Sequence, residues 1–412
     1  MKKQTLFVII IWILLLSACS SSPDRTISEL QPTESLEPTK VLIIEDTKTV
    51  PVIPTLTAEI LDESPPRGAS AEFSTDFSVH SISYDEVLSG GPPKDGIPPI
   101  DDPVFVSVSE ADDWIEAVEP VIQLVINGEV KAYPLQVLIW HEIVNDSVGG
   151  VPVTVSFCPL CNTAIVFERT VNGDVLDFGT TGRLRYSNLI MYDRQTESWW
   201  QQATGESIVG ELTGTQLTFV PAVMISWENF KDTHPEGSVL SRDTGFMRSY
   251  GSNPYGGYDD INQPPFLYYG PLTPDNLPPV ARIIAVEFGD ESMAYPYDLL
   301  EELHVINDEV GEEEIVIFWS PGTSSALDKS NISEGRDVGS PSVFSRKLDG
   351  EVFDFEFNGT AFVDVQTLSV WNMQGLAVEG DMTGQQLSPL VAVNHFWFSW
   401  AAFKPETQVY QP

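Results

Sequence analysis

The sequence predicts a mainly β fold with a few short helices, a strand-rich α+β class built as two tandem related subdomains. Three observations predict it. The chain has 412 residues, which is more than one ordinary domain needs. Its 31 prolines and 29 glycines indicate many turns, which favours strands over helical bundles. Several motifs also occur twice in the same order, and this indicates an internal duplication.

Residues 1–18 are typical of a bacterial lipoprotein signal peptide. Lys2 and Lys3 give a basic start, the apolar run LFVIIIWILLL follows, and LSAC ending at Cys19 resembles a lipobox. The resemblance implies cleavage before Cys19 and attachment of fatty acyl chains such as palmitate. We therefore expect a lipid anchor on the extracytoplasmic side of a bacterial membrane. An uncleaved helix with a chance cysteine is the alternative.

The segment 19–70 and the charge of the chain limit its partners. Residues 19–70 are rich in Ser, Thr, Pro and Glu and predict a flexible tether. The chain has 60 acidic and 21 basic residues, a formal charge of −39. Phosphate binding needs clustered Lys and Arg, so nucleic acid is excluded as a partner. A solvated acidic surface or a site for hard cations such as calcium remains, and the sequence identifies no small-molecule or protein partner.

The first subdomain, residues 71–250, is read in chain order from its turns and caps. Ser109 predicts the N-cap of a short helix, and Asn127-Gly128 predicts a hairpin. Pro134 opens a second short helix over PLQVLIWHEIV. A strand over 151–157 then leads into the turn Cys-Pro-Leu-Cys, and a further hairpin centres on Asn172-Gly173.

Residues 281–412 repeat this pattern after a connector, residues 251–280, rich in Tyr, Pro and Gly. The chain therefore predicts two related β-rich subdomains. The repeated motifs are AYP (from Ala132 and Ala294), IVND and VIND (Ile143, Val305), VFERTVNGDVLDF and VFSRKLDGEVFDF (Val166, Val343), GELTGTQL and GDMTGQQL (Gly210, Gly380), and a looser echo of ISWENF in FSWAAF (Ile225, Phe398).

The differences between the two copies carry the functional signal. The turn at 158–161, CPLC, aligns with SPGT at 320–323, and an alanine follows each turn, Ala164 and Ala326. This predicts a shared turn geometry with both cysteines confined to the first copy. His141-Glu142 aligns with Leu303-His304. We expect any site to lie in the first copy, with the second as a degenerate partner that forms one wall of a cleft.

Cys158 and Cys161 leave three kinds of chemistry open. Two cysteines at this spacing can form a structural disulfide or buried thiols, bind a soft metal, or exchange thiol for disulfide. A metal site needs a third ligand, and His141 is the best candidate because it comes just before the strand that ends at Cys158. Such a site would suit zinc or copper(I), although a lone histidine is more often a hydrogen-bonded core residue.

The polar residues around these three are candidates for supporting roles, and none is assigned a catalytic role. The pattern HExxH is absent because Asn145 stands where the second histidine would be. Asn145 and Asp146 recur in the second copy as Asn307 and Asp308, which favours a role in a turn or cap. The candidates that could orient ligands or move protons are Glu142, Asn145, Asp146, Asn162 and Arg183.

Two further clusters favour structural roles. Arg183, Arg185 and Arg194 in so acidic a chain favour internal ion pairs with carboxylates. Between Ser241 and Pro279 five tyrosines occur among Gly, Pro and Asn, and packing is the favoured role for most of them.

From these motifs the chain is identified as a member of an uncharacterised family, the bacterial domain of unknown function numbered 3179. The resemblance covers about residues 85–412 and rests on GGPPKDGIPPIDDP, AYPLQVLIWHEIVND, FCPLCNTAIVFER, MYDRQTESWWQQATGE, YGSNPYGGYD and HFWFSWAAFKPET. It implies that these segments form one unit, and it implies no reaction.

Two hypotheses of function follow, and whether the chain is an enzyme is left open between them. The first is a cell-envelope lipoprotein with a metal or thiol site at Cys158, Cys161 and His141 in its first copy. The second is an envelope binding or scaffold protein with a structural disulfide and no catalysis. The two differ in whether Cys158, Cys161 and His141 converge at a pocket.

Overall fold

A computed structural model describes residues 64–412. The predicted signal peptide, Cys19 and most of the predicted tether lie outside the described residues. The described part is mainly β with a few short helices, which confirms the predicted fold class. None of its helices is long and apolar enough to cross a membrane.

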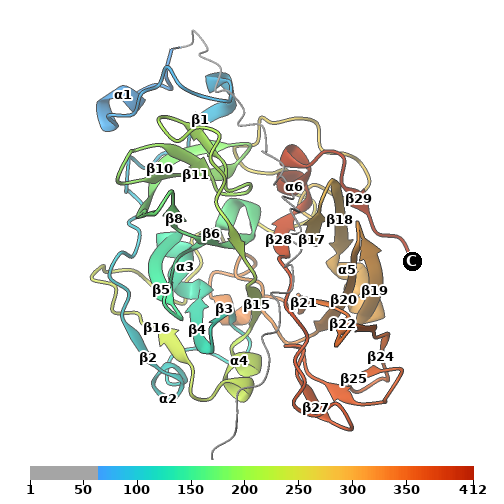
Figure 1. The fold of residues 1–412 in the computed structure, drawn as a ribbon. Coiled ribbons are helices and arrows are strands. Elements are labelled where there is room, and N and C mark those ends of the chain that lie inside the picture. Colours follow the sequence, from blue (N-terminus) through green and yellow to red (C-terminus); the bar gives the residue numbers. More distant parts are fainter. Residues whose placement is uncertain (1–63) are drawn as a thin grey trace, which may run out of the picture. The chain divides into compact units, whose positions relative to one another are not determined.

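The helices are short and lie between strands (Figure 1). They are α1 (Ala69–Glu72), α2 (Val108–Ala111), α3 (Leu135–His141), α4 (Trp227–Thr233), α5 (Tyr297–Leu303) and α6 (Trp397–Phe403), with single 3₁₀ turns η1 (Tyr84–Glu86), η2 (Pro159–Cys161) and η3 (Ile332–Glu334).

The first half of the described chain, residues 64–250, forms two five-stranded sheets of its own. One has the order β1 (Val87–Ser89), β10 (Phe178–Arg185), β11 (Asn188–Asp193), β12 (Trp199–Gln201), β13 (Ser207–Val209). The other has the order β15 (Val223–Ser226), β3 (Pro120–Ile126), β4 (Glu129–Pro134), β16 (Ser238–Leu240), β2 (Phe105–Ser107). A small hairpin adds β8 (Thr170–Val171) and β9 (Asp174–Val175).

The second half, residues 281–412, has smaller sheets of its own. A three-stranded sheet has the order β19 (Val305–Val310), β20 (Glu313–Ser320), β21 (Ser340–Ser345). A four-stranded sheet has the order β24 (Phe355–Phe357), β25 (Phe362–Asp364), β26 (Val370–Trp371), β27 (Ala377–Glu379), and a hairpin joins β22 (Lys347–Leu348) to β23 (Glu351–Val352).

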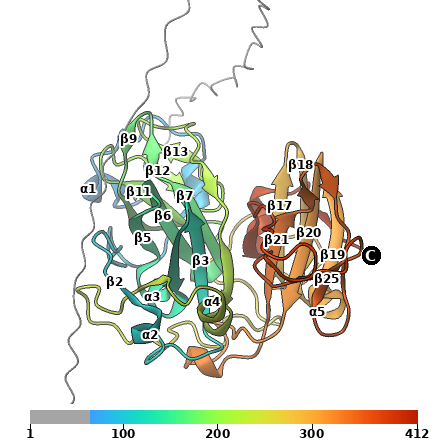
Figure 2. The ribbon, with the colours of Figure 1, turned by 60° about the horizontal axis from the view of Figure 1, so that its bottom comes forward.

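One eight-stranded sheet contains strands of both halves. Its order is β29 (Gln408–Val409), β18 (Glu291–Pro296), β17 (Arg282–Phe288), β28 (Val393–Phe396), β7 (Thr163–Glu168), β6 (Val151–Cys158), β5 (Ile143–Val148), with β14 (Phe219–Val220) also on β7. The halves meet where Asn394 of β28 pairs with Ala164 of β7, and Figure 2 shows β17 on the side of the second half that faces β7. The largest buried cluster includes Phe157 and Phe396, so the core is continuous across this junction.

The two halves carry corresponding elements in the same order. A hairpin (β3–β4, β17–β18) leads to a seven-residue helix (α3, α5) and an antiparallel pair (β5–β6, β19–β20). Later a strand returns to the first hairpin (β15, β28), and a strand parallel to its second member follows (β16, β29). The internal duplication remains an inference, and these correspondences support it.

Two parts of the sequence alignment between the copies are wrong. Helix α4 begins at Trp227 and α6 at Trp397, so Trp227 corresponds to Trp397 and the echo of ISWENF in FSWAAF is out of register. The turn geometry expected at 158–161 and 320–323 is not shared. Residues 159–162 connect β6 to β7, whereas residues 321–339 connect β20 to β21, and Ala326 lies inside this longer loop.

Some predictions of turns and helix ends in the first half are confirmed, and others are wrong. Both Asn-Gly hairpins are present, between β3 and β4 and between β8 and β9. Helix α2 is capped by Ser107, with a capping box to Glu110, so the prediction of Ser109 as N-cap is wrong. Helix α3 ends at His141, earlier than predicted, because Ile143 already pairs in the β5–β6 ladder.

Candidate thiol site

Strand β6 ends at Cys158 and delivers the motif Cys-Pro-Leu-Cys into a single 3₁₀ turn, η2. Pro159 is the first residue of the turn, where its fixed φ suits a helical start and its missing N–H is not needed. Asn162 ends the turn in the left-handed region, with φ 51°, and its N–H bonds the Pro159 carbonyl at 3.3 Å. Both cysteines are therefore held on one tight turn between β6 and β7.

The two cysteines are free thiols and are buried, with 2% of Cys158 and 0% of Cys161 exposed. Both sulfurs face the carbonyl oxygen of Ser187, at 3.9 Å from Cys158 Sγ and 3.4 Å from Cys161 Sγ. Tyr186 and Ser187 form the turn between β10 and β11, and both have positive φ, 52° and 66°. Thiols donate weakly to such an oxygen, so this turn orients the pair.

Glu142 lies next to this pair. It caps the C-terminus of α3 with φ 59°, and its carbonyl accepts the N–H of Phe157, the residue before Cys158, at 2.8 Å. Its side chain is buried and has no hydrogen-bond partner among the described residues. Burial raises the pKa of the Glu142 carboxyl to about 8. The group is therefore mostly protonated at neutral pH.

The environment of the thiols favours their protonated form. Burial raises the pKa of Cys158 well above its ordinary value, and the neighbouring Cys161 and the charge of an ionised Glu142 raise it further. Cys158, Cys161 and Glu142 thus form one buried group of proton-bearing side chains. A buried polar group without a partner is costly, and such groups concentrate at functional sites.

Two tyrosines of the connector cover the thiols. The hydroxyl of Tyr258 donates to the carbonyl of Leu160 at 2.8 Å and accepts the N–H of Phe266 at 3.3 Å. Tyr255 lies close enough to Glu142 and Cys158 for their charges to act on it, although burial is the main reason that its pKa is raised. The sequence predicted packing roles for most of these tyrosines but did not indicate that Tyr255 and Tyr258 pack over the cysteines.

The connector is fastened by the long loop 321–339 of the second half. The carboxylate of Asp259 bonds Arg282 Nη2 at 2.7 Å and Arg336 Nη1 at 2.8 Å, and it accepts from the Ser325 hydroxyl. Burial alone would raise the pKa of Asp259, but these partners outweigh burial and the pKa is lowered. Backbone bonds from 253, 257 and 258 to 330, 328 and 327 add to this attachment.

The structure does not bring His141 together with the cysteines as a third ligand. Its Nδ1 donates to the Pro98 carbonyl at 2.7 Å, so Nε2 of the neutral ring accepts from the Tyr250 hydroxyl at 2.7 Å. Burial lowers the pKa of His141, which favours this neutral form. Both ring nitrogens are occupied, and the imidazole links α3 to two loops.

Asn145 and Asp146 lie in strand β5, where they join elements and do not cap a turn. The Asn145 amide bonds the Phe178 backbone in both directions, at 2.8 and 2.9 Å. The Asp146 carboxylate accepts from Lys131 at 3.0 Å and from the Tyr133 hydroxyl at 2.6 Å. Both residues therefore hold β5 to its neighbours.

The remaining two candidates differ in their distance from the thiols. Asn162 adjoins Cys161, and its buried Nδ2 has no partner among the described residues. Arg183 pairs with Glu72 at 3.3 Å, which ties α1 to β10. Arg185 and Arg194 also form ion pairs, with Glu86 at 2.6 Å and with Asp101 at 3.0 Å, as the sequence predicted.

The arrangement limits which metal the thiols could hold. Across residues 64–412, no group of three or more His, Cys, Asp or Glu side chains is placed to hold a metal ion. Cys158 and Cys161 therefore supply two ligands, fewer than a zinc site uses, whereas soft thiolates alone select copper(I).

Residues 94–407 match the family described as "Protein of unknown function (DUF3179)". No curated protein and no solved structure matches the chain.

Proposed function

Because this chain belongs to the family of proteins of unknown function called DUF3179, its chemistry has to be inferred from its own residues, and we propose that it is a thiol–disulfide exchange protein of the cell envelope. The observation that carries the proposal is the pairing of two free buried thiols with the unpartnered carboxyl of Glu142. Burying a carboxyl that has no hydrogen-bond partner costs free energy that packing alone does not require.

The proposed reaction consumes a disulfide, RS–SR′. One cysteine thiolate attacks a sulfur of this substrate, the RS–SR′ bond breaks, and R′S⁻ leaves. The second cysteine then attacks the first, so that the Cys158–Cys161 bond forms and RS⁻ leaves. The substrate is reduced to two thiols, the protein dithiol is oxidised, and the two protons lost by the cysteines end on the released thiols.

Glu142 is the proposed carrier of these protons. In its ionised form it accepts the proton of Cys158, and in its acidic form it returns a proton to a leaving sulfur. Since its pKa is about 8, both forms are available near neutral pH. The Tyr255 ring must turn aside for the substrate to reach the buried sulfurs.

The test is the pH profile of thiol oxidation by a small disulfide. In wild-type protein the rate rises through about pH 8, and Glu142→Gln loses this rise and is about tenfold slower above it. Glu119→Gln is the matched control. Burial raises the pKa of Glu119 to about 7, and its carboxylate accepts hydrogen bonds from the Gln136 side chain and the Glu116 N–H.

The other outcomes separate the alternatives. Cys158→Ser and Cys161→Ser each abolish disulfide closure, and the variant that retains the attacking cysteine traps a mixed disulfide detectable by mass spectrometry. A disulfide that resists reduction in native protein contradicts the proposal and favours the scaffold hypothesis. Stoichiometric copper or zinc that Cys158→Ser loses contradicts it in favour of a metal site.

The envelope location rests on the sequence around Cys19. A basic start, an apolar run and LSAC support a lipid anchor there. Cells that express Cys19→Ala release the chain from membranes and no longer incorporate labelled palmitate into it. Continued labelling of this variant contradicts the anchor.

A further inference from the structure

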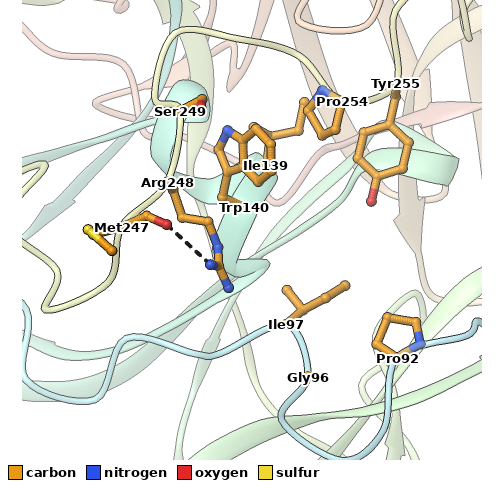
Figure 3. A pocket seen from close by; sticks show the side chains of 10 residues that line it. All are labelled: Pro92, Gly96, Ile97, Ile139, Trp140, Met247, Arg248, Ser249, Pro254 and Tyr255. Carbon is orange, nitrogen blue, oxygen red and sulfur yellow. Dashed lines mark hydrogen bonds between the residues drawn. The ribbon is translucent and has the colours of Figure 1, made fainter.

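A pocket of about 600 Å³ opens beside the thiol site. It lies between the segment 92–97, the end of α3 and the segment 247–255 (Figure 3). Its lining includes Ile97, Trp140, Met247, Arg248 and Tyr255. Tyr255 also neighbours Cys158 and Glu142, so one residue belongs to both the pocket and the cover of the thiols.

The pocket has one cationic group, Arg248, and its guanidinium is not used by the fold. Its hydrogen bond in the described part of the chain is to the carbonyl of Met247, at 3.3 Å, and it has no ion pair there. Seven of the nine other arginines in the described residues are paired with carboxylates, as in Arg169–Asp177 at 2.6 Å. The exceptions are Arg67 and Arg242, and Arg242 bonds the Gln136 side chain and the Trp114 carbonyl. Arg248 is exposed, so in a chain of charge −39 its guanidinium is available at the pocket to pair with an anion.

The other walls suit an apolar body. Figure 3 shows the indole of Trp140, the side chain of Ile97 and the ring of Tyr255 around the space that the Arg248 guanidinium enters. Trp140 is fixed, since its Nε1 donates to the Ser252 carbonyl at 3.1 Å. Aromatic rings of this kind stack on flat ligands, and a few placed polar groups set their orientation.

We propose that this pocket binds small aromatic carboxylates and that disulfides of this class are the substrates of the thiol pair. The second part rests on the proposed thiol–disulfide exchange. Arg248 holds the carboxylate, Trp140 and Ile97 hold the apolar body, and the ligand ends against Tyr255, beyond which lies Cys158.

The first experiment compares two reactive probes on the full-length protein. 5,5′-Dithiobis(2-nitrobenzoate) is an aromatic disulfide with carboxylates, and 4,4′-dithiodipyridine is a neutral aromatic disulfide. The rate of thiol oxidation by the carboxylate probe, divided by the rate with the neutral probe, falls about tenfold in Arg248→Gln. Arg67→Gln, at an exposed arginine outside the pocket, removes the same charge and keeps the wild-type ratio. An unchanged ratio in Arg248→Gln overturns the assignment of substrate class.

The second experiment tests the pocket without any thiol chemistry. Calorimetry on the double variant Cys158→Ser/Cys161→Ser shows binding of 2-naphthoate, about tenfold weaker binding after Arg248→Gln is added, and weaker binding of neutral 2-naphthamide. Absent binding of 2-naphthoate overturns the pocket inference even where the thiols react. Thiols that react with neither probe, together with 2-naphthoate binding, overturn the exchange proposal and retain the binding site.

Discussion

Two loops follow corresponding strands but have different roles in the structure. One connects β6 to β7, and the other connects β20 to β21. Residues 159–162 make one tight turn that holds two thiols. The loop of residues 321–339 is longer and contains η3. Its Ser325 and Arg336 bond the carboxylate of Asp259 in the connector. The second half thus contributes to the candidate site, since its loop 321–339 bonds the connector that covers the thiols of the first half.

The residues that cap α3 and α5 sharpen the same contrast. Glu142 and His304 occupy the same left-handed position, with φ 59° and 61°, so the backbone there belongs to the fold and not to one site. His304 has partners, because its ring stacks on Phe357 at 4.3 Å and contacts Trp319. Glu142 has none among the described residues. The cap does not need a carboxyl, which is consistent with the role in thiol chemistry that we propose for Glu142.

The largest effect is expected where the long loop holds the connector. Asp259→Asn leaves Arg282, which is 8% exposed, without its buried counter-charge and costs about 3–5 kcal/mol in the free energy of unfolding. Urea unfolding measures it. The cysteines also react faster with an alkylating reagent, because their cover loosens. Asp275→Asn, at an exposed aspartate, is the control. Unchanged alkylation in a destabilised Asp259→Asn protein would separate the loop from the thiols.

The contrast between Glu142 and His304 predicts a pH effect of a few kcal/mol. The folded pKa of Glu142, about 8, lies above its ordinary value of 4.5. Its contribution to stability is therefore complete below pH 4.5, is lost as pH rises from there to about 8, and is constant above. Glu142→Gln lessens the fall in stability between pH 5 and 8, measured by urea unfolding at both values. Equal slopes in both proteins would refute the raised pKa.

The smallest effect concerns a device that the halves share. Trp200 Nε1 donates to Asp193, and Trp371 Nε1 donates to Asp364, both at 2.9 Å. Because the hydrogen bonds correspond, Asp193→Ala and Asp364→Ala should each cost about 1–3 kcal/mol, by similar amounts. Thermal unfolding of the two variants measures the difference. If the two variants lose unfolding free energy by amounts that differ several-fold, the same hydrogen bond contributes differently to stability in the two halves.

The sequence predicted the parts of the fold that depend on neighbours in the chain. Asn127-Gly128 and Asn172-Gly173 gave their hairpins because both residues suit positive φ. Tyr186-Ser187 makes a turn with the same backbone and was missed, since neither residue type signals it. The placement of β28 between β17 and β7 depends on packing between distant segments, which no local pattern records.

The candidate site was predicted only in part, because local sequence patterns do not record contacts between distant segments. Cys158, Cys161 and Glu142 were candidates from the sequence because their spacing and their differences from the aligned residues of the second half are visible in it. Tyr255 and Tyr258 were not assigned to the site, because their connector has no periodicity that would place it over the cysteines. His141 was expected as a ligand from chain proximity alone. Its contact with Tyr250 comes from a distant loop.

The position of β28 also governs how the chain can fold during synthesis. Its residues, Val393–Phe396, are near the C-terminus, yet they lie between strands made much earlier. Until these residues are available to pair, β7 and β17 expose backbone edges that attract other strands and promote aggregation. Closing the sheet then requires contacts between residues far apart in the chain, which slows folding. A nascent or truncated chain that ends before residue 393 is thus expected to depend on chaperones.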